Sequence, residues 1–166
     1  KNDTWYIALN ENPASATFHR VTTATDNPPS PLGGIAEYSP ASDVIIWVGY
    51  DGGAGTDPYY IFAPTDKGSL SSAQTTAGAS SADNWNALSG VKGNGGVNCV
   101  GGGDACPRPG ITITRTGKMV NRTANNKLYW FTTSNDSTVN EIWTYDPPNK
   151  RWQKITDTNT PGWNTS

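Results

Sequence analysis

The chain has 166 residues, which is enough for one domain with a sizeable hydrophobic core. Seven Trp, seven Tyr and three Phe argue against disorder, and only 16% of the residues are charged, against about 25% in ordinary domains. The net charge of −2 gives no electrostatic reason to expect nucleic acid as a partner, and no apolar run approaches the roughly 20 residues of a membrane-spanning helix.

Short β-prone runs separated by turn residues follow one another along the chain, a pattern typical of an all-β fold. In chain order we predict strands at residues 4–9, 18–21, 34–38, 44–50, 59–63, 111–115, 127–132, 141–145 and 151–155. Polar or Pro-containing turns follow several of these runs, as in Ser39–Asp43 and Asp146–Lys150. Residues 69–86 consist mostly of Ser, Ala, Thr and Gly without helical periodicity, so we expect a long loop there.

The order of these runs repeats within the chain. Residues 28–88 and 107–155 each pass from a Pro-rich lead-in through a small-residue strand, a polar turn and an apolar strand to an aromatic strand. Each unit then ends on a Trp and a short final strand. Residues 2–9 align with 140–147, so the opening of the chain matches the second half of the unit.

Glycine and aromatic residues stand at characteristic places in this repeat. Gly49 and Tyr50 end the apolar strand of the first unit and Trp85 follows later, while in the second unit Trp143 precedes Trp152. This pattern resembles the kelch repeat, in which each repeat is one four-stranded blade of a β-propeller. The resemblance implies kelch-type β-propeller blades, about two and a half of them, and therefore an incomplete propeller. A β-sandwich is the alternative all-β fold.

The chain departs from the family pattern in three places. Thr132 and Thr133 stand where the Gly pair of the second unit belongs, and Leu32 replaces a common arginine. An insertion also separates Pro64 from Trp85 in the first unit.

The resemblance divides the chain into three parts. Residues 1–25 supply the outer strands of a partial blade, residues 26–92 form a first full blade with a long loop insertion, and residues 93–166 form a second full blade with the approach to the next. A blade is apolar on both faces, so neighbouring blades must cover each other. We therefore expect other blades of a longer chain, or other copies of this chain, to complete the assembly.

Tryptophans are expected to divide between the core and the surface. Those in or beside predicted strands are expected to pack between blades: Trp5, Trp47, Trp143 and Trp152. Trp85 and Trp163 have loop-like surroundings, which makes them candidates for partner or ligand contacts.

The two cysteines, Cys99 and Cys106, enclose a Gly-rich segment and are predicted to form a disulfide. Closing so short a loop would stabilise the fold by about 2.5 kcal/mol in the chain-entropy model. The alternative is a pair of reduced thiols. A zinc site would need further ligands, and the only histidine, His19, is distant in sequence.

Four Asn-X-Ser/Thr triplets mark possible N-glycosylation sites, at Asn2, Asn121, Asn135 and Asn164. Together with the close Cys pair and the low charge content, they predict a secreted, extracellular glycoprotein. We expect glycans at Asn121 and Asn135 because these lie in or beside predicted turns.

Few groups in the chain are suited to catalysis. His19 has no nucleophile motif beside it, and Glu37 is the only glutamate expected near an interior. The loop Asp51–Asp57 offers carboxylates for calcium but lacks the alternating acidic pattern of a dedicated calcium loop. We therefore predict no enzyme activity, no catalytic residue, no cofactor and no metal site.

Three functions remain open. The first is a structural or adhesive extracellular module that assembles through blade packing. The second is a lectin-like propeller that binds carbohydrate, which would show a shallow aromatic cavity with convergent polar groups. The third is a non-catalytic piece of a secreted kelch-type oxidase.

Overall fold

A computed structural model describes residues 4–8, 17–21, 34–49, 59–65, 68–99, 106, 118–133 and 140–155. Ten strands and two short helical segments lie in these ranges: β1 (Thr4–Ala8), β2 (Thr17–Val21), β3 (Gly34–Ser39), β4 (Val44–Gly49), β5 (Tyr59–Phe62), α1 (Ser72–Ala77), β6 (Trp85–Ala87), η2 (Asn94–Gly96), β7 (Lys118–Arg122), β8 (Lys127–Thr133), β9 (Asn140–Asp146) and β10 (Arg151–Lys154). The predicted all-β class is confirmed.

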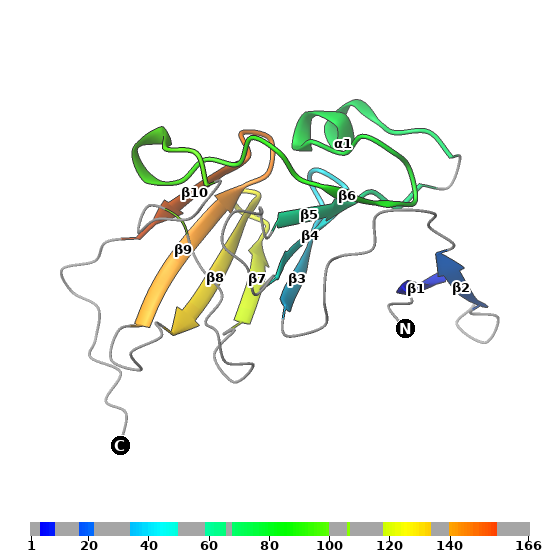
Figure 1. The fold of residues 1–166 in the computed structure, drawn as a ribbon. Coiled ribbons are helices and arrows are strands. Elements are labelled where there is room, and N and C mark those ends of the chain that lie inside the picture. Colours follow the sequence, from blue (N-terminus) through cyan, green and yellow to red (C-terminus); the bar gives the residue numbers. More distant parts are fainter. Residues whose placement is uncertain are drawn as a thin grey trace, which may run out of the picture.

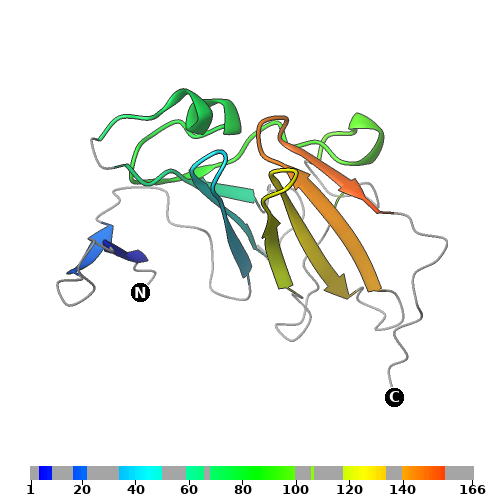
Figure 2. The same ribbon diagram turned by 180° about the vertical axis from the view of Figure 1, so that it is seen from behind.

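Two antiparallel four-stranded sheets form the body of the described structure (Figure 1). The first sheet has the order β3-β4-β5-β6 and the second has the order β7-β8-β9-β10, so every strand pairs with its neighbour in the chain. Strands β1 and β2 form a separate two-stranded hairpin. Figures 1 and 2 show this hairpin on the side of the first sheet that lies away from the second sheet.

Similar turns join the strands of both sheets at one end of the molecule, the upper end in Figure 1. The turns at 40–43, 123–126 and 147–150 each finish on a residue with positive φ, namely Asp43 (50°), Asn126 (55°) and Lys150 (49°). Asp and Asn tolerate this left-handed conformation well, which explains their place at the end of two of these turns.

A single core lies between the two sheets. The first sheet contributes Tyr59 and an aliphatic face, and the second sheet contributes aromatic rings; the fully buried members are Val44, Ile46, Val48, Tyr59, Ile61, Leu128, Trp130, Trp143, Tyr145 and Trp152. The Tyr59 and Trp152 rings meet across the two sheets with centroids 6.1 Å apart. The prediction that Trp143 and Trp152 pack between sheets is confirmed, whereas Trp47 is half-buried on the opposite face of the first sheet.

Strand register places aromatic residues at the same positions in both sheets. Trp47 pairs with Tyr60 in the first sheet as Trp130 pairs with Trp143 in the second. The pairs Phe62–Trp85 and Tyr145–Trp152 correspond in the same way. We call Trp130, Trp143, Tyr145 and Trp152 the buried quartet, and Trp47, Tyr60, Phe62 and Trp85 the outward quartet. The alternation of strand side chains turns the outward quartet away from the core.

Three features differ from the strands and loops expected from the sequence. Strand β7 lies at Lys118–Arg122, while the strand predicted at 111–115 lies outside the described residues. Residues 69–86 are not simply a loop, because they contain helix α1 and the start of β6. A capping box between Ser71 and Gln74 begins α1, and Gly78 ends it with φ of 106°. The Cβ atom of any other residue at position 78 would also lie only 2.6 Å from Leu88 Cδ1, which is too close for an ordinary contact.

The connection that follows β6 crosses to the far edge of the second sheet. Lys92 donates its backbone N–H to Lys150 O at 2.9 Å, and its own carbonyl accepts from Trp152 N at 2.7 Å. The segment therefore adds a short parallel contact beside β10. Among the described residues, no helix is long and apolar enough to cross a membrane.

Candidate functional site

The outward face of the first sheet is aromatic. The rings of Trp47 and Tyr60 meet edge to face at 5.7 Å, and those of Phe62 and Trp85 lie 5.3 Å apart. Tyr38, farther along the same face on β3, remains 43% exposed. Phe62 and Trp85 are already buried, at 2% and 6% exposure, whereas Trp47 and Tyr60 are half-buried. The outer face of an ordinary two-sheet sandwich alternates to polar residues, and this aromatic face differs from that pattern.

The outward face of the second sheet is different at the equivalent positions. The places of Val44, Ile46 and Ile61 are taken by Lys127, Tyr129 and Thr144, as counted from the turns and the strand register. The three aliphatic residues of the first sheet are fully buried, whereas the polar residues of the second sheet line a cavity.

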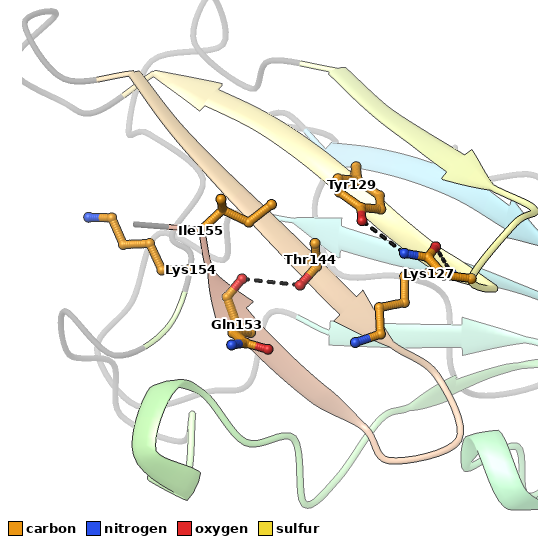
Figure 3. Close-up of a pocket in the computed structure, with 7 residues that line it drawn as sticks. Lys127, Tyr129, Thr144, Gln153, Lys154 and Ile155 are labelled. Carbon is orange, nitrogen blue, oxygen red and sulfur yellow. Dashed lines mark hydrogen bonds between the residues drawn. The ribbon is translucent and has the colours of Figure 1, made fainter. Parts of the chain in front are cut away.

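That cavity has a volume of about 350 Å³ and is lined by Asn125, Lys127, Tyr129, Thr144, Gln153, Lys154 and Ile155 (Figure 3). We call it the polar cavity. Figure 3 shows Tyr129, Thr144 and Gln153 coming from the three adjacent strands β8, β9 and β10. The sheet itself is the floor of the cavity, so these side chains start from a rigid base.

Hydrogen bonds and charges fix the side chains of the polar cavity. Asn125 Nδ2 donates to the Tyr129 hydroxyl at 2.9 Å, and Thr144 Oγ1 donates to the backbone carbonyl of Gln153 at 3.3 Å. The Arg122 guanidinium lies 6.0 Å from the centre of the Tyr129 ring. The hydrogen bond from Asn125, with the positive charges of Arg122 and Lys127, lowers the pKa of Tyr129 below its usual value.

A second cavity, of about 430 Å³, lies at the turn end of the first sheet beside α1. Its lining residues are Asp43, Pro64, Thr65, Ser69, Leu70, Ser71 and Gln74. Gln74 is 2% exposed, and its amide nitrogen donates to the Pro64 carbonyl at 2.7 Å and to two oxygens of Asp43 at 3.0 Å. Asp43 also accepts from the Tyr38 hydroxyl at 2.6 Å, which raises the pKa of Tyr38 to about 12. The polar groups in the wall of this cavity are therefore used in hydrogen bonds that hold α1 on the first sheet.

Trp85 is not the loop residue that the sequence suggested. It begins strand β6, pairs with Phe62 and is only 6% exposed. Its ring packs against Phe62 within the outward quartet and does not project into solvent. Trp163, the other predicted contact residue, lies outside the described residues.

A disulfide joins Cys99 to Cys106, with their Cα atoms 5.7 Å apart. Both cysteines are buried, and the Cys99 backbone N–H donates to the Val91 carbonyl at 2.9 Å. The bond therefore anchors the connection between the two sheets to the core.

The residues considered for catalysis or metal binding are not brought together. Glu37 lies on β3 and accepts the backbone N–H of Asn121 at 3.2 Å, so it links the edges of the two sheets. His19 lies on β2, a strand described through its backbone, and Asp51–Asp57 lies outside the described residues. Within the described part of the chain, no group of three or more His, Cys, Asp or Glu side chains is arranged to hold a metal ion.

Asn121 occupies a place unsuited to a glycan. It lies near the end of β7, where it pairs with Leu128, shortly before the turn at 123–126. Both atoms of its side-chain amide are buried and have no hydrogen-bond partner in the described structure. Because the glycan would have to attach to this buried nitrogen, the fold argues against modification here. Asn2, Asn135 and Asn164 lie outside the described residues.

We expect Asn121 to remain unmodified when the chain is produced in a eukaryotic secretory host, and Asn135 to carry a glycan. Peptide mapping after glycosidase release measures both sites. Thr123→Ala removes the triplet without touching the buried amide, so it should leave the mass of any attached glycan unchanged. A glycan on Asn121 would show that this strand is arranged differently in the secreted protein.

Comparison with protein-family models, with curated proteins and with solved structures found no match to this chain.

Proposed function

We propose that this chain is a non-enzymatic structural or adhesive module of an extracellular glycoprotein, made of kelch-type propeller blades that associate with further blades through the outward quartet. The observation that carries the proposal is the correspondence between the two quartets. Each aromatic residue of the buried quartet has an aromatic partner at the same register position in the first sheet.

The buried quartet indicates what covers such a surface. Its four rings are at most 1% exposed because the aliphatic face of the first sheet lies against them. A surface of the same composition in the same register fits the same kind of cover. The proposed occupant of the outward quartet is therefore the aliphatic face of another four-stranded sheet.

The hairpin β1–β2 supports this choice of occupant. Ile7 pairs with Phe18 as Tyr145 pairs with Trp152, so the hairpin has the register of the third and fourth strands of a sheet. A preceding sheet that ends in these strands still needs its first and second strands. We propose that these come from another copy or from further sequence of the same protein.

An extracellular location agrees with the chemistry of the chain. The disulfide between Cys99 and Cys106 is of the kind that persists in oxidising compartments. The triplets at Asn2, Asn135 and Asn164, which lie outside the described residues, offer further glycosylation sites.

Sedimentation velocity of the 166-residue chain over a range of concentrations tests the proposal. We expect self-association, with the covering sheet completed on the β1–β2 hairpin by strands of another copy. Trp47→Lys should abolish it, because a lysine in the outward quartet would have to be buried without a partner. Phe131→Lys is the control, since Phe131 is an exposed aromatic residue on the outward face of the second sheet, which the proposed contact does not use. A compact monomer at every concentration would contradict association between copies and would favour a self-contained β-sandwich.

A further inference from the structure

We propose that the polar cavity on the outward face of the second sheet binds a carboxylated saccharide, such as an oligomer of hexuronic acid. This inference is independent of the proposed assembly, which uses the opposite face of the molecule.

The second sheet departs from the repeat where the cavity lies. Lys127, Tyr129 and Thr144 replace residues that in the first sheet are fully buried and aliphatic. All three replacements line the same cavity. A face meant only to receive another sheet would keep the aliphatic residues, as the first sheet does.

Among the described residues, the outward face of the second sheet carries more cationic than anionic side chains. The strand register puts four cationic side chains on it, those of Lys118, Arg122, Lys127 and Arg151, and among the described residues one carboxylate, that of Asp146. Lys127 Nζ lies 4.0 Å from Asp146 Oδ2, and the other lysine that lines the cavity, Lys154, forms a salt bridge with Glu141. Covering such a face with a sheet would bury excess positive charge at considerable cost, whereas an anionic ligand would compensate it.

Apolar and polar groups converge in the cavity. The Tyr129 ring and Ile155 offer apolar surface, on which the C–H face of a sugar can pack. The Gln153 and Asn125 amides and the Lys127 ammonium offer donors for hydroxyl and carboxylate oxygens. A cavity of about 350 Å³ matches one or two sugar rings.

Isothermal titration of the full chain with trigalacturonic acid at low ionic strength tests the inference. We expect saturable binding that weakens at least tenfold in Tyr129→Ala and in Lys127→Gln, while Tyr129→Phe retains most of the affinity because the ring remains. The methyl-esterified trimer, which has the same rings without the charge, should bind at least tenfold more weakly. Circular dichroism of each variant shows whether the sheet is intact.

Lys118→Gln is the matched control, because Lys118 is exposed on the same face but does not line the cavity. It should change the affinity by less than twofold. Three results would overturn the inference: no binding of the acid trimer, equal binding of the acid and its methyl ester, or an equal loss in Lys118→Gln and Lys127→Gln, which would indicate attraction to the whole face.

Discussion

Replacing Trp130 by alanine is expected to lower the free energy of unfolding by about 3–5 kcal/mol, whereas Trp47→Ala at the equivalent position should cost less than about 1.5 kcal/mol. Trp130 is fully buried and its ring lies 5.8 Å from that of Trp152. Its removal leaves a large cavity between the two sheets. Trp47 is half-buried on the outward face, so water replaces much of its lost contact.

Urea unfolding followed by far-UV circular dichroism measures both values. A loss of 3–5 kcal/mol is a large share of the 5–15 kcal/mol by which a typical domain is stable, so Trp130→Ala should shift the midpoint clearly. The measurement belongs at a concentration below that at which the chain associates. Equal losses for the two variants under those conditions would mean that Trp47 is already covered within one chain, as Phe62 and Trp85 are.

The two variants also separate the two fold hypotheses. In a self-contained sandwich, the outward face of the first sheet is a finished surface, and Trp47 contributes little at any concentration. In an assembly of blades, the cost of Trp47→Ala grows with protein concentration, because association adds the missing cover. The same pair of proteins therefore tests stability and assembly together.

Most strands were predictable because turn residues mark their ends. The predicted runs at 44–50 and 127–132 correspond to β4 and β8, and the Pro-containing turn before Arg151 separates β9 from β10. Both runs are continuously apolar, over Val44–Val48 and Leu128–Phe131, and a short unbroken apolar run between turn residues is typical of a strand that is covered on both faces.

Strand β7 was not predictable from its own residues. Met119 and Val120 are its only apolar members, and Lys118, Asn121 and Arg122 make the segment look like a turn. It becomes a strand because β8 pairs with it along its whole length, which is a tertiary effect that propensity does not contain.

Helix α1 could have been found. Ser71 and Gln74 have the spacing of a capping box, and Gly78 stands where a helix often ends. The low hydrophobicity of the segment concealed it, because only Gln74 and Ala77 of the helix are buried.

The polar cavity lay beyond sequence reasoning. Lys127, Tyr129 and Thr144 are ordinary residues for exposed strands when each is considered alone. Their meaning depends on the strand register, which brings β8 and β9 together and shows that their counterparts in the first sheet are buried.

Replacing Gln74 by alanine is expected to lower the free energy of unfolding by about 2–4 kcal/mol, an unusually large loss for a polar side chain on a six-residue helix. A helix of this length has little stability of its own. Gln74 attaches it to the first sheet by donating to Asp43 and to Pro64 O, and its Oε1 accepts the Ser71 N–H at 2.8 Å. Alanine leaves these buried groups without partners.

Gln74→Glu distinguishes the loss of hydrogen bonds from the loss of volume, because it keeps the size of the side chain. The new carboxyl group would lie beside Asp43 Oδ2, which is 3.0 Å from the amide nitrogen it replaces. Burial and the like charge would raise the pKa of the new carboxyl group in the folded state above its unfolded value of about 4.3. The stabilising contribution of the protonated form is therefore complete below about pH 4 and is lost as the pH rises through the folded-state pKa.

The free energy of unfolding should be measured at pH 4 and pH 7. The value for Gln74→Glu should be close to that of the parent chain at pH 4 and lower than it at pH 7, whereas the value for Gln74→Ala should be lower at both pH values. Thr76→Ala serves as the control, because Thr76 is exposed on the same helix and should change stability by no more than about 0.5 kcal/mol. A loss below 1 kcal/mol for Gln74→Ala would mean that α1 is held by packing of Leu70 and Ala77 on the core and not by this hydrogen-bond network.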